Sequence, residues 1–167
     1  MSQQPQRQQT NEPRLRPTNP ASLVVVGLAA AALGWVVLAR FYGDIPSIPW
    51  LPAFTVFALA ICEALLARST KARIDRRPGT APVQALAVAR YVVLAKASSL
   101  AGSIFAGFYA GLLIWLLAQR TRLSAAASDI APTAGGLVAA LALIAAALWL
   151  ERACRVPKRP DEEEEPQ

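Results

Sequence analysis

Glu63 is the residue whose type and place most suggest chemistry, because it puts a carboxylate into a long apolar run. The run extends from Trp50 to Ala67 and ends at Arg68. An ionised carboxylate inside a bilayer is costly unless it is paired or faces a wet cavity, so such residues are candidates for proton or substrate coupling. Glu63 precedes Ala67 by four residues, which places it about one helical turn, roughly 6 Å, from the end of the run.

Lys96 is the residue that we expect to neutralise Glu63. It lies at the start of the third apolar run, one loop away from the second, and therefore at nearly the same depth. A Glu63–Lys96 ion pair would fix the register of the two helices, with the long Lys96 stem reaching toward the membrane surface. The alternative is a coupling carboxylate, as in small drug–proton antiporters with one membrane-embedded Glu, but such a carboxylate usually lies nearer the middle of the bilayer.

Little else in the sequence could do chemistry. There is no histidine, which excludes imidazole acid–base catalysis and imidazole metal ligation. No Gly-rich phosphate loop, metal-ligand cluster or pair of catalytic carboxylates is found, and Glu63 is the only acid within the predicted spans. Cys62 and Cys154 lie toward the predicted cytoplasmic side, where thiols stay reduced. We therefore expect no enzyme, no metal and no cofactor.

The elements that must position these residues are membrane helices. Of the 167 residues, 54% are hydrophobic, and they are gathered into four runs of about the 20 residues that a helix needs to cross a bilayer. The sequence predicts an all-α integral membrane protein with one membrane domain, residues 22–152, between disordered tails 1–21 and 153–167. The predicted spans are residues 22–39, 50–67, 97–118 and 131–150.

Three details of these helices follow from Gly and Pro. Gly43, Pro46 and Pro49 prevent helix continuation after the first span, so the first two helices should run antiparallel. The third helix can extend from residue 83 to residue 119. Pro132 can begin the fourth helix, since proline is favoured in a first helical turn.

The distribution of Lys and Arg predicts the orientation. Fourteen of the 17 basic residues flank one side of the spans, in the N-terminal tail, the loop between the second and third spans, the entry to the third helix and the C-terminal tail. Only Arg40, Arg120 and Arg122 lie on the other side. Because basic residues are retained in the cytoplasm, both termini are predicted to be cytoplasmic, in the plasma membrane.

A cytoplasmic loop at residues 68–82 holds the densest positive charge. One interpretation is that its charges set topology and rest against anionic lipid headgroups. The other is a docking site for a cytoplasmic partner, although the acidic run 162–165 could also fold back onto it. Nucleic acid is not expected, because the positive residues adjoin apolar runs and have no aromatic stacking partners. The basic residues of the loop and of the next helix entry are Arg68, Lys71, Arg73, Arg76, Arg77 and Arg90.

Small residues at four-residue spacing form a ridge on the third helix. Such a ridge lets another backbone approach closely, and its last two members form a GxxxG. The neighbour could belong to the same chain or to a second copy in a homodimer; packing within the chain is the simpler interpretation. The ridge, beginning one turn earlier at Ala95, consists of Ser99, Ser103, Gly107 and Gly111.

The strings "RRPGTAPVQALAVARYVVLAKASSLAGSIFAGFYAG" and "RFYGDIPSIPWLP" resemble an actinobacterial family of small four-helix membrane proteins. That family is classed as a domain of unknown function and is often encoded beside folate-biosynthesis genes. The resemblance covers about Pro17 to Arg155. It implies a multi-pass membrane protein and no biochemical activity. The residues on the family pattern are Arg77, Pro78, Gly79, Thr80, Arg90 and Lys96.

Two functions are consistent with these features. The first is a non-enzymatic structural or accessory membrane protein that acts through helix packing and its basic cytoplasmic loop. The second is a small oligomeric transporter with Glu63 and Lys96 along its path.

Overall fold

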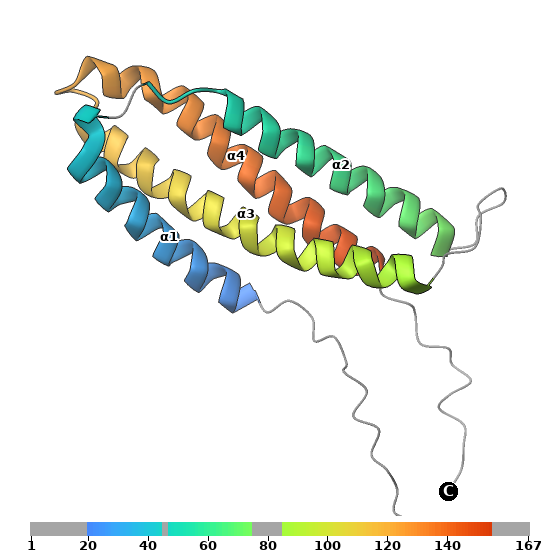
Figure 1. Cartoon of the computed structure of the whole chain (residues 1–167). Coiled ribbons are helices and arrows are strands. Elements are labelled where there is room, and N and C mark those ends of the chain that lie inside the picture. Colours follow the sequence, from blue (N-terminus) through green and yellow to red (C-terminus); the bar gives the residue numbers. More distant parts are fainter. Residues whose placement is uncertain (1–19, 45–46, 75–84, 155–167) are drawn as a thin grey trace, which may run out of the picture.

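Four long helices make up the described structure. The computed structural model describes residues 20–44, 47–74 and 85–154, and within these ranges it contains no strand (Figure 1). All four helices are long and apolar enough to cross a membrane, which confirms the predicted all-α architecture. The elements in chain order are α1 (Pro20–Phe41), the short 3₁₀ helix η1 (Tyr42–Asp44), α2 (Leu51–Ile74), α3 (Ala85–Gln119) and α4 (Ser124–Ala153).

Helices α2 and α4 are longer than the apolar runs predict. α2 continues to Ile74, so Arg68, Lys71 and Arg73 lie on a helix and not in a loop. Arg and Lys have helix propensities close to that of leucine, so these charges do not end the helix, whereas the Pro and Gly beyond them disfavour it. Arg76 and Arg77 lie outside the described residues.

Pro132 lies inside α4 and does not begin it. The helix starts eight residues earlier, at Ser124, in a stretch of Ala and Ser that forms a helix readily. An internal proline removes one backbone hydrogen bond and widens the helix locally. Next to the proline, the Thr133 hydroxyl donates a hydrogen bond to the backbone carbonyl of Asp129, one turn earlier, at 2.7 Å.

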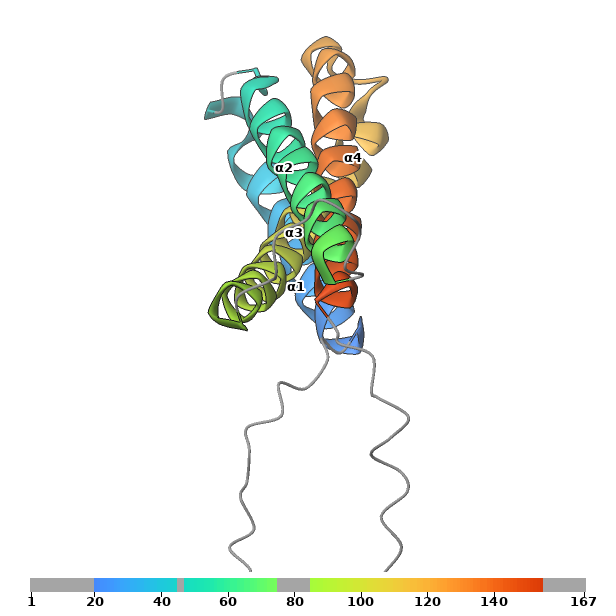
Figure 2. The same ribbon diagram turned by 90° about the vertical axis from the view of Figure 1, so that its right-hand side faces the viewer.

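Helices α3 and α4 form the centre of the bundle, and the other two cover it from opposite sides (Figures 1 and 2). α1 packs on α3 and α2 packs on α4, so the spatial order is α1–α3–α4–α2. α1 and α2 run in opposite directions, as predicted, but their described residues make no extensive contact with each other. The first residue of α1 and the last of α4 lie at the same end of the bundle (Figure 1).

The packing places small residues inside and large apolar residues outside. The interior of α4 is built mainly from alanine, with Ala126, Ala140 and Ala147 completely buried. Large side chains face outward along every helix, for example Leu28 at 66%, Phe54 at 64% and Val138 at 62% exposure. Such a large apolar surface would be unstable in water, but it matches the apolar chains of lipids. Because lipid chains are as apolar as leucine, the helices are held together by the close packing of small residues. The arrangement fits a multi-pass membrane protein.

Candidate functional site

Glu63 lies on the face of α2 that packs against α4. The buried residues of α2 recur at intervals of seven, three, four and three, which is the seam of a helix packed lengthwise on another. Glu63 is 1% exposed, so the packing closes it off from both water and lipid. The seam consists of Ala53, Ala60, Glu63, Ala67 and Thr70.

The Glu63 carboxylate has no partner in this seam. Neither of its oxygens has a hydrogen bond among the described residues. Ser98, a buried residue of α3, faces the carboxyl group, yet its hydroxyl does not satisfy either oxygen. No hydrogen bond therefore joins the Glu63 carboxylate to Lys96, the partner expected from the sequence. Lys96 is half-buried on α3, where its backbone carbonyl accepts a hydrogen bond from Ser99 at 2.9 Å.

Three exposed basic residues, Arg68, Lys71 and Arg73, form the cationic end of α2. Arg68 lies against α4, with its guanidinium carbon 5.8 Å from the centroid of the Trp149 ring. This contact lies within the range of a cation–π interaction. Arg90, which the sequence groups with these cations, is exposed on α3.

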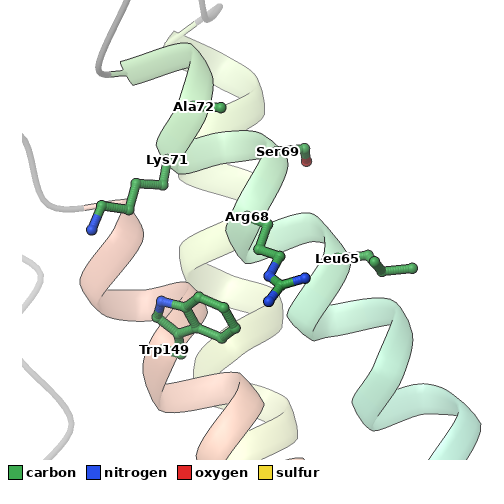
Figure 3. Close-up of a pocket in the computed structure, with 6 residues that line it drawn as sticks. All are labelled: Leu65, Arg68, Ser69, Lys71, Ala72 and Trp149. Carbon is green, nitrogen blue, oxygen red and sulfur yellow. The ribbon is translucent and has the colours of Figure 1, made fainter. Parts of the chain in front are cut away.

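A hollow of about 550 Å³ lies at the cationic end of α2 (Figure 3). We call it the cationic cleft. Its charged residues are Arg68 and Lys71, and Trp149 forms the wall that α4 contributes. The cleft is lined by Leu65, Arg68, Ser69, Lys71, Ala72 and Trp149.

Two further buried acids lie on α4, which corrects the expectation that Glu63 is the only acid within a span. Asp129 and Glu151 are each 6% exposed. Asp129 accepts hydrogen bonds from the Tyr42 hydroxyl at 3.1 Å and from the Ile48 amide at 3.2 Å. It thereby ties both ends of the connection between α1 and α2 to the start of α4. The signal for Asp129 is the helix-forming "SAAASD" before Pro132, which extends the fourth helix backwards over the acid.

The surroundings of Tyr42 support its hydrogen bond to Asp129. Desolvation by burial, and then the hydrogen bond to Asp129 and its negative charge, raise the pKa of the Tyr42 phenol from 10.0 to about 12. The ring also contacts Trp115, with centroids 4.7 Å apart. Asp129 is thus hydrogen-bonded to the connection between α1 and α2, whereas neither oxygen of Glu63 has a hydrogen bond.

The small-residue ridge of α3 packs against α1 of the same chain. A Cβ atom added to Gly107 would lie 1.9 Å from the Gly27 carbonyl oxygen, and one added to Gly111 would lie 2.0 Å from that of Ala31. The Ser103 hydroxyl donates to the carbonyl of Leu23, 80 residues earlier. All three contacts have that same sequence separation, so α1 and α3 run parallel and in register. Of the two interpretations of the ridge, the structure shows the intramolecular one. Ser99 continues the ridge and is buried.

The remaining chemistry is sparse. Cys62 is exposed on α2 and Cys154 is buried at the end of α4, both as free thiols. Burial raises the pKa of the Cys154 thiol, which keeps it protonated and unreactive at neutral pH. Within residues 20–44, 47–74 and 85–154, no group of three or more His, Cys, Asp or Glu could hold a metal ion.

Comparison with known proteins assigns a family and no activity. The family described as "Protein of unknown function (DUF3180)" matches residues 23–158, and the chain belongs to that family. The match covers α2, α3 and α4 and all of α1 except its first three residues. No curated protein and no solved structure matches the chain.

Proposed function

We propose that this protein is a non-enzymatic accessory protein of the plasma membrane, which acts through the cationic end of α2. The supporting observation is that Arg68, Lys71 and Arg73 are exposed on the last two turns of a rigid helix. Their exposure leaves all three side chains open to contact from outside the bundle. In this proposal, helix packing in the bilayer holds the charged surface at the level of the lipid headgroups. Anionic headgroups or an acidic membrane partner can bind it there.

In this proposal both termini are cytoplasmic and the cell is actinobacterial. Support for the orientation comes from the bias of Lys and Arg toward one side of the spans. The placement of the first residue of α1 and the last of α4 at one end of the bundle agrees with it. The resemblance of the sequence to actinobacterial proteins encoded beside folate-biosynthesis genes supports the cell type, and it makes a folate-pathway membrane protein a reasonable first partner to test.

The test is site-specific crosslinking in cells. A photoreactive amino acid at position 73 samples the cationic end of α2, and one at position 120, on an exposed arginine at the other end, is the matched control. We expect position 73 to crosslink reproducibly to one membrane or cytoplasmic protein, and the R68Q/K71Q variant to lose that crosslink. Equal capture at both positions would refute the proposal.

A second candidate function, small-molecule or proton transport, is favoured by the unpaired Glu63 carboxylate alone. A buried carboxylate without a partner is costly in a membrane, and that cost is the usual mark of a working ionisable group. In the transporter, Glu63 would take up and release a proton in a small oligomer, with Lys96 along the path. The test is proton flux into vesicles that contain the purified protein and a pH-sensitive dye. Flux above that of empty vesicles, abolished by Glu63→Gln, would establish transport and overturn the accessory role.

A further inference from the structure

The cationic cleft combines side chains from two helices that are far apart in the sequence. Five of its lining residues come from the last turns of α2, and Trp149 comes from the last turns of α4. The hollow is open to the outside of the bundle and has a volume of about 550 Å³. In Figure 3 the side chains of Arg68 and Lys71 extend toward the α4 side of the cleft.

Trp149 orients Arg68 for an anion. A guanidinium that stacks on an aromatic ring uses its flat face, and the N–H groups along its edge stay available for a bidentate contact with an oxyanion. The guanidinium carbon lies 5.8 Å from the ring centroid, within the range of a cation–π interaction. Lys71 follows Arg68 by three residues, so its ammonium group lies on nearly the same face of α2. One anion can therefore contact both the guanidinium N–H groups of Arg68 and the ammonium group of Lys71.

No acidic residue is among the described residues that line the cleft. Its two charged lining residues, Arg68 and Lys71, are both basic. The acids nearest to them along α2 and α4, Glu63 and Glu151, are 1% and 6% exposed, and neither lines the cleft. A ligand that brings its own negative charge fits this site.

The apolar walls indicate that the anion is part of a lipid. Leu65 is 58% exposed and Trp149 is 38% exposed, and both border the cations of the cleft. Ile61, one turn before Leu65, is 48% exposed and continues the apolar surface into the span. A phospholipid carries its phosphate directly beside acyl chains, so it satisfies both the cations and this surface, whereas a soluble phosphate would satisfy the cations alone. Tryptophan is also favoured at the level of the headgroups.

We propose that the cationic cleft binds one phospholipid with a negatively charged headgroup, its phosphate between Arg68 and Lys71 and an acyl chain along Leu65. The site names a ligand for part of the surface on which the proposed function rests. Lipid binding itself needs no protein partner, so it can be tested on the purified chain.

The test is native mass spectrometry of the full chain in a mild detergent, titrated with phosphatidylglycerol or with phosphatidylcholine of the same acyl chains. We expect one phosphatidylglycerol to be retained in preference to phosphatidylcholine. The R68Q/K71Q variant should lose about thirtyfold in affinity, since each of the two cations contributes about 1 kcal/mol near an anionic headgroup and about 1.4 kcal/mol corresponds to a tenfold change. The matched control R120Q/R122Q loses the same charge at the other end of the bundle and should stay within about twofold of the wild type.

The control for folding is the helical circular dichroism of each variant. R68K is the second variant, because it keeps the charge and loses the fork; it should bind several-fold more weakly than the wild type even if R68Q/K71Q does not fold. Three results would overturn the lipid site. R68Q/K71Q and R120Q/R122Q could bind phosphatidylglycerol equally, millimolar inorganic phosphate could displace the lipid, or removal of residues 161–167 could raise lipid binding at least about tenfold.

Each overturning result has a distinct meaning. Equal binding by the two double variants means that charge acts only diffusely. Displacement by phosphate identifies a soluble-anion site. A gain on removal of residues 161–167 identifies the acidic tail as the occupant. If the lipid binds as proposed while position 73 captures no protein, the accessory function fails and the lipid site stands.

Discussion

Gly107→Ala should push α1 away from α3. A Cβ atom at this position would lie 1.9 Å from the carbonyl oxygen of Gly27, and ordinary van der Waals contact begins at 3.4 Å. The two backbones must therefore separate by about 1.5 Å along this contact, because the atom that is struck belongs to the backbone and cannot rotate aside.

The expected loss in the free energy of unfolding is about 2–4 kcal/mol. Overpacking of a close contact costs about 1–3 kcal/mol, and the same separation weakens the hydrogen bond from Ser103 to Leu23, which contributes about 1 kcal/mol. Gly43→Ala is the matched control. A Cβ atom at Gly43 has nothing within 4 Å, so that variant should lie within about 0.5 kcal/mol of the wild type.

The assay is unfolding in mixed micelles, titrated with a denaturing detergent and followed by helical circular dichroism. Native mass measurement of the same samples reports the oligomeric state. If Gly107→Ala is as stable as Gly43→Ala, the reasoning from the close contact is refuted. If Gly107→Ala converts a dimer into a stable monomer, the GxxxG serves a second copy and the intramolecular role assigned to it is wrong.

Three further predictions follow from the buried polar groups. Glu63→Gln should not lower the free energy of unfolding, because neither oxygen of the Glu63 carboxylate has a hydrogen bond to lose. Its effect should add to that of Lys96→Met within about 0.5 kcal/mol, and strong coupling in the double-mutant cycle would contradict this. Tyr42→Phe should cost about 1 kcal/mol below pH 10. Because the Tyr42 pKa is raised from 10.0 to about 12, the hydrogen bond to α4 is fully present below pH 10 and its contribution falls between pH 10 and 12; a cost that is constant across this range, measured by unfolding at each pH, would refute the assignment. A maleimide should label Cys62 faster than Cys154 in micelles and both equally after unfolding, as judged by mass; faster labelling of Cys154 would contradict its burial.

The sequence alone predicted the four helices, but it placed the ends of α2 and α4 incorrectly. The apolar runs identify four helices because a helix that crosses a bilayer needs about 20 consecutive apolar residues, which is a long and clear signal. The ends were misplaced because charge does not stop a helix. α2 continues beyond its apolar run through Arg68 and Lys71, and the Ala and Ser residues before Pro132 extend α4 at its start.

Helix order accounts for what the sequence missed at the site. The expected pairing of Glu63 with Lys96 assumed that consecutive helices pack together, whereas α2 packs on α4. The 3-4 spacing of the α2 seam places Glu63 on a buried face but cannot say which helix covers it. The contact of Arg68 with Trp149 joins residues 81 positions apart, and no local pattern reports it.

The most direct test of the account is the crosslinking yield from position 73 in cells, compared between R68Q/K71Q and Glu63→Gln. The account assigns the working surface to the cationic end of α2 and a packing position to Glu63. It therefore predicts that R68Q/K71Q abolishes the crosslink while Glu63→Gln leaves its yield unchanged. Loss of the crosslink in Glu63→Gln, with full retention in R68Q/K71Q, would contradict it.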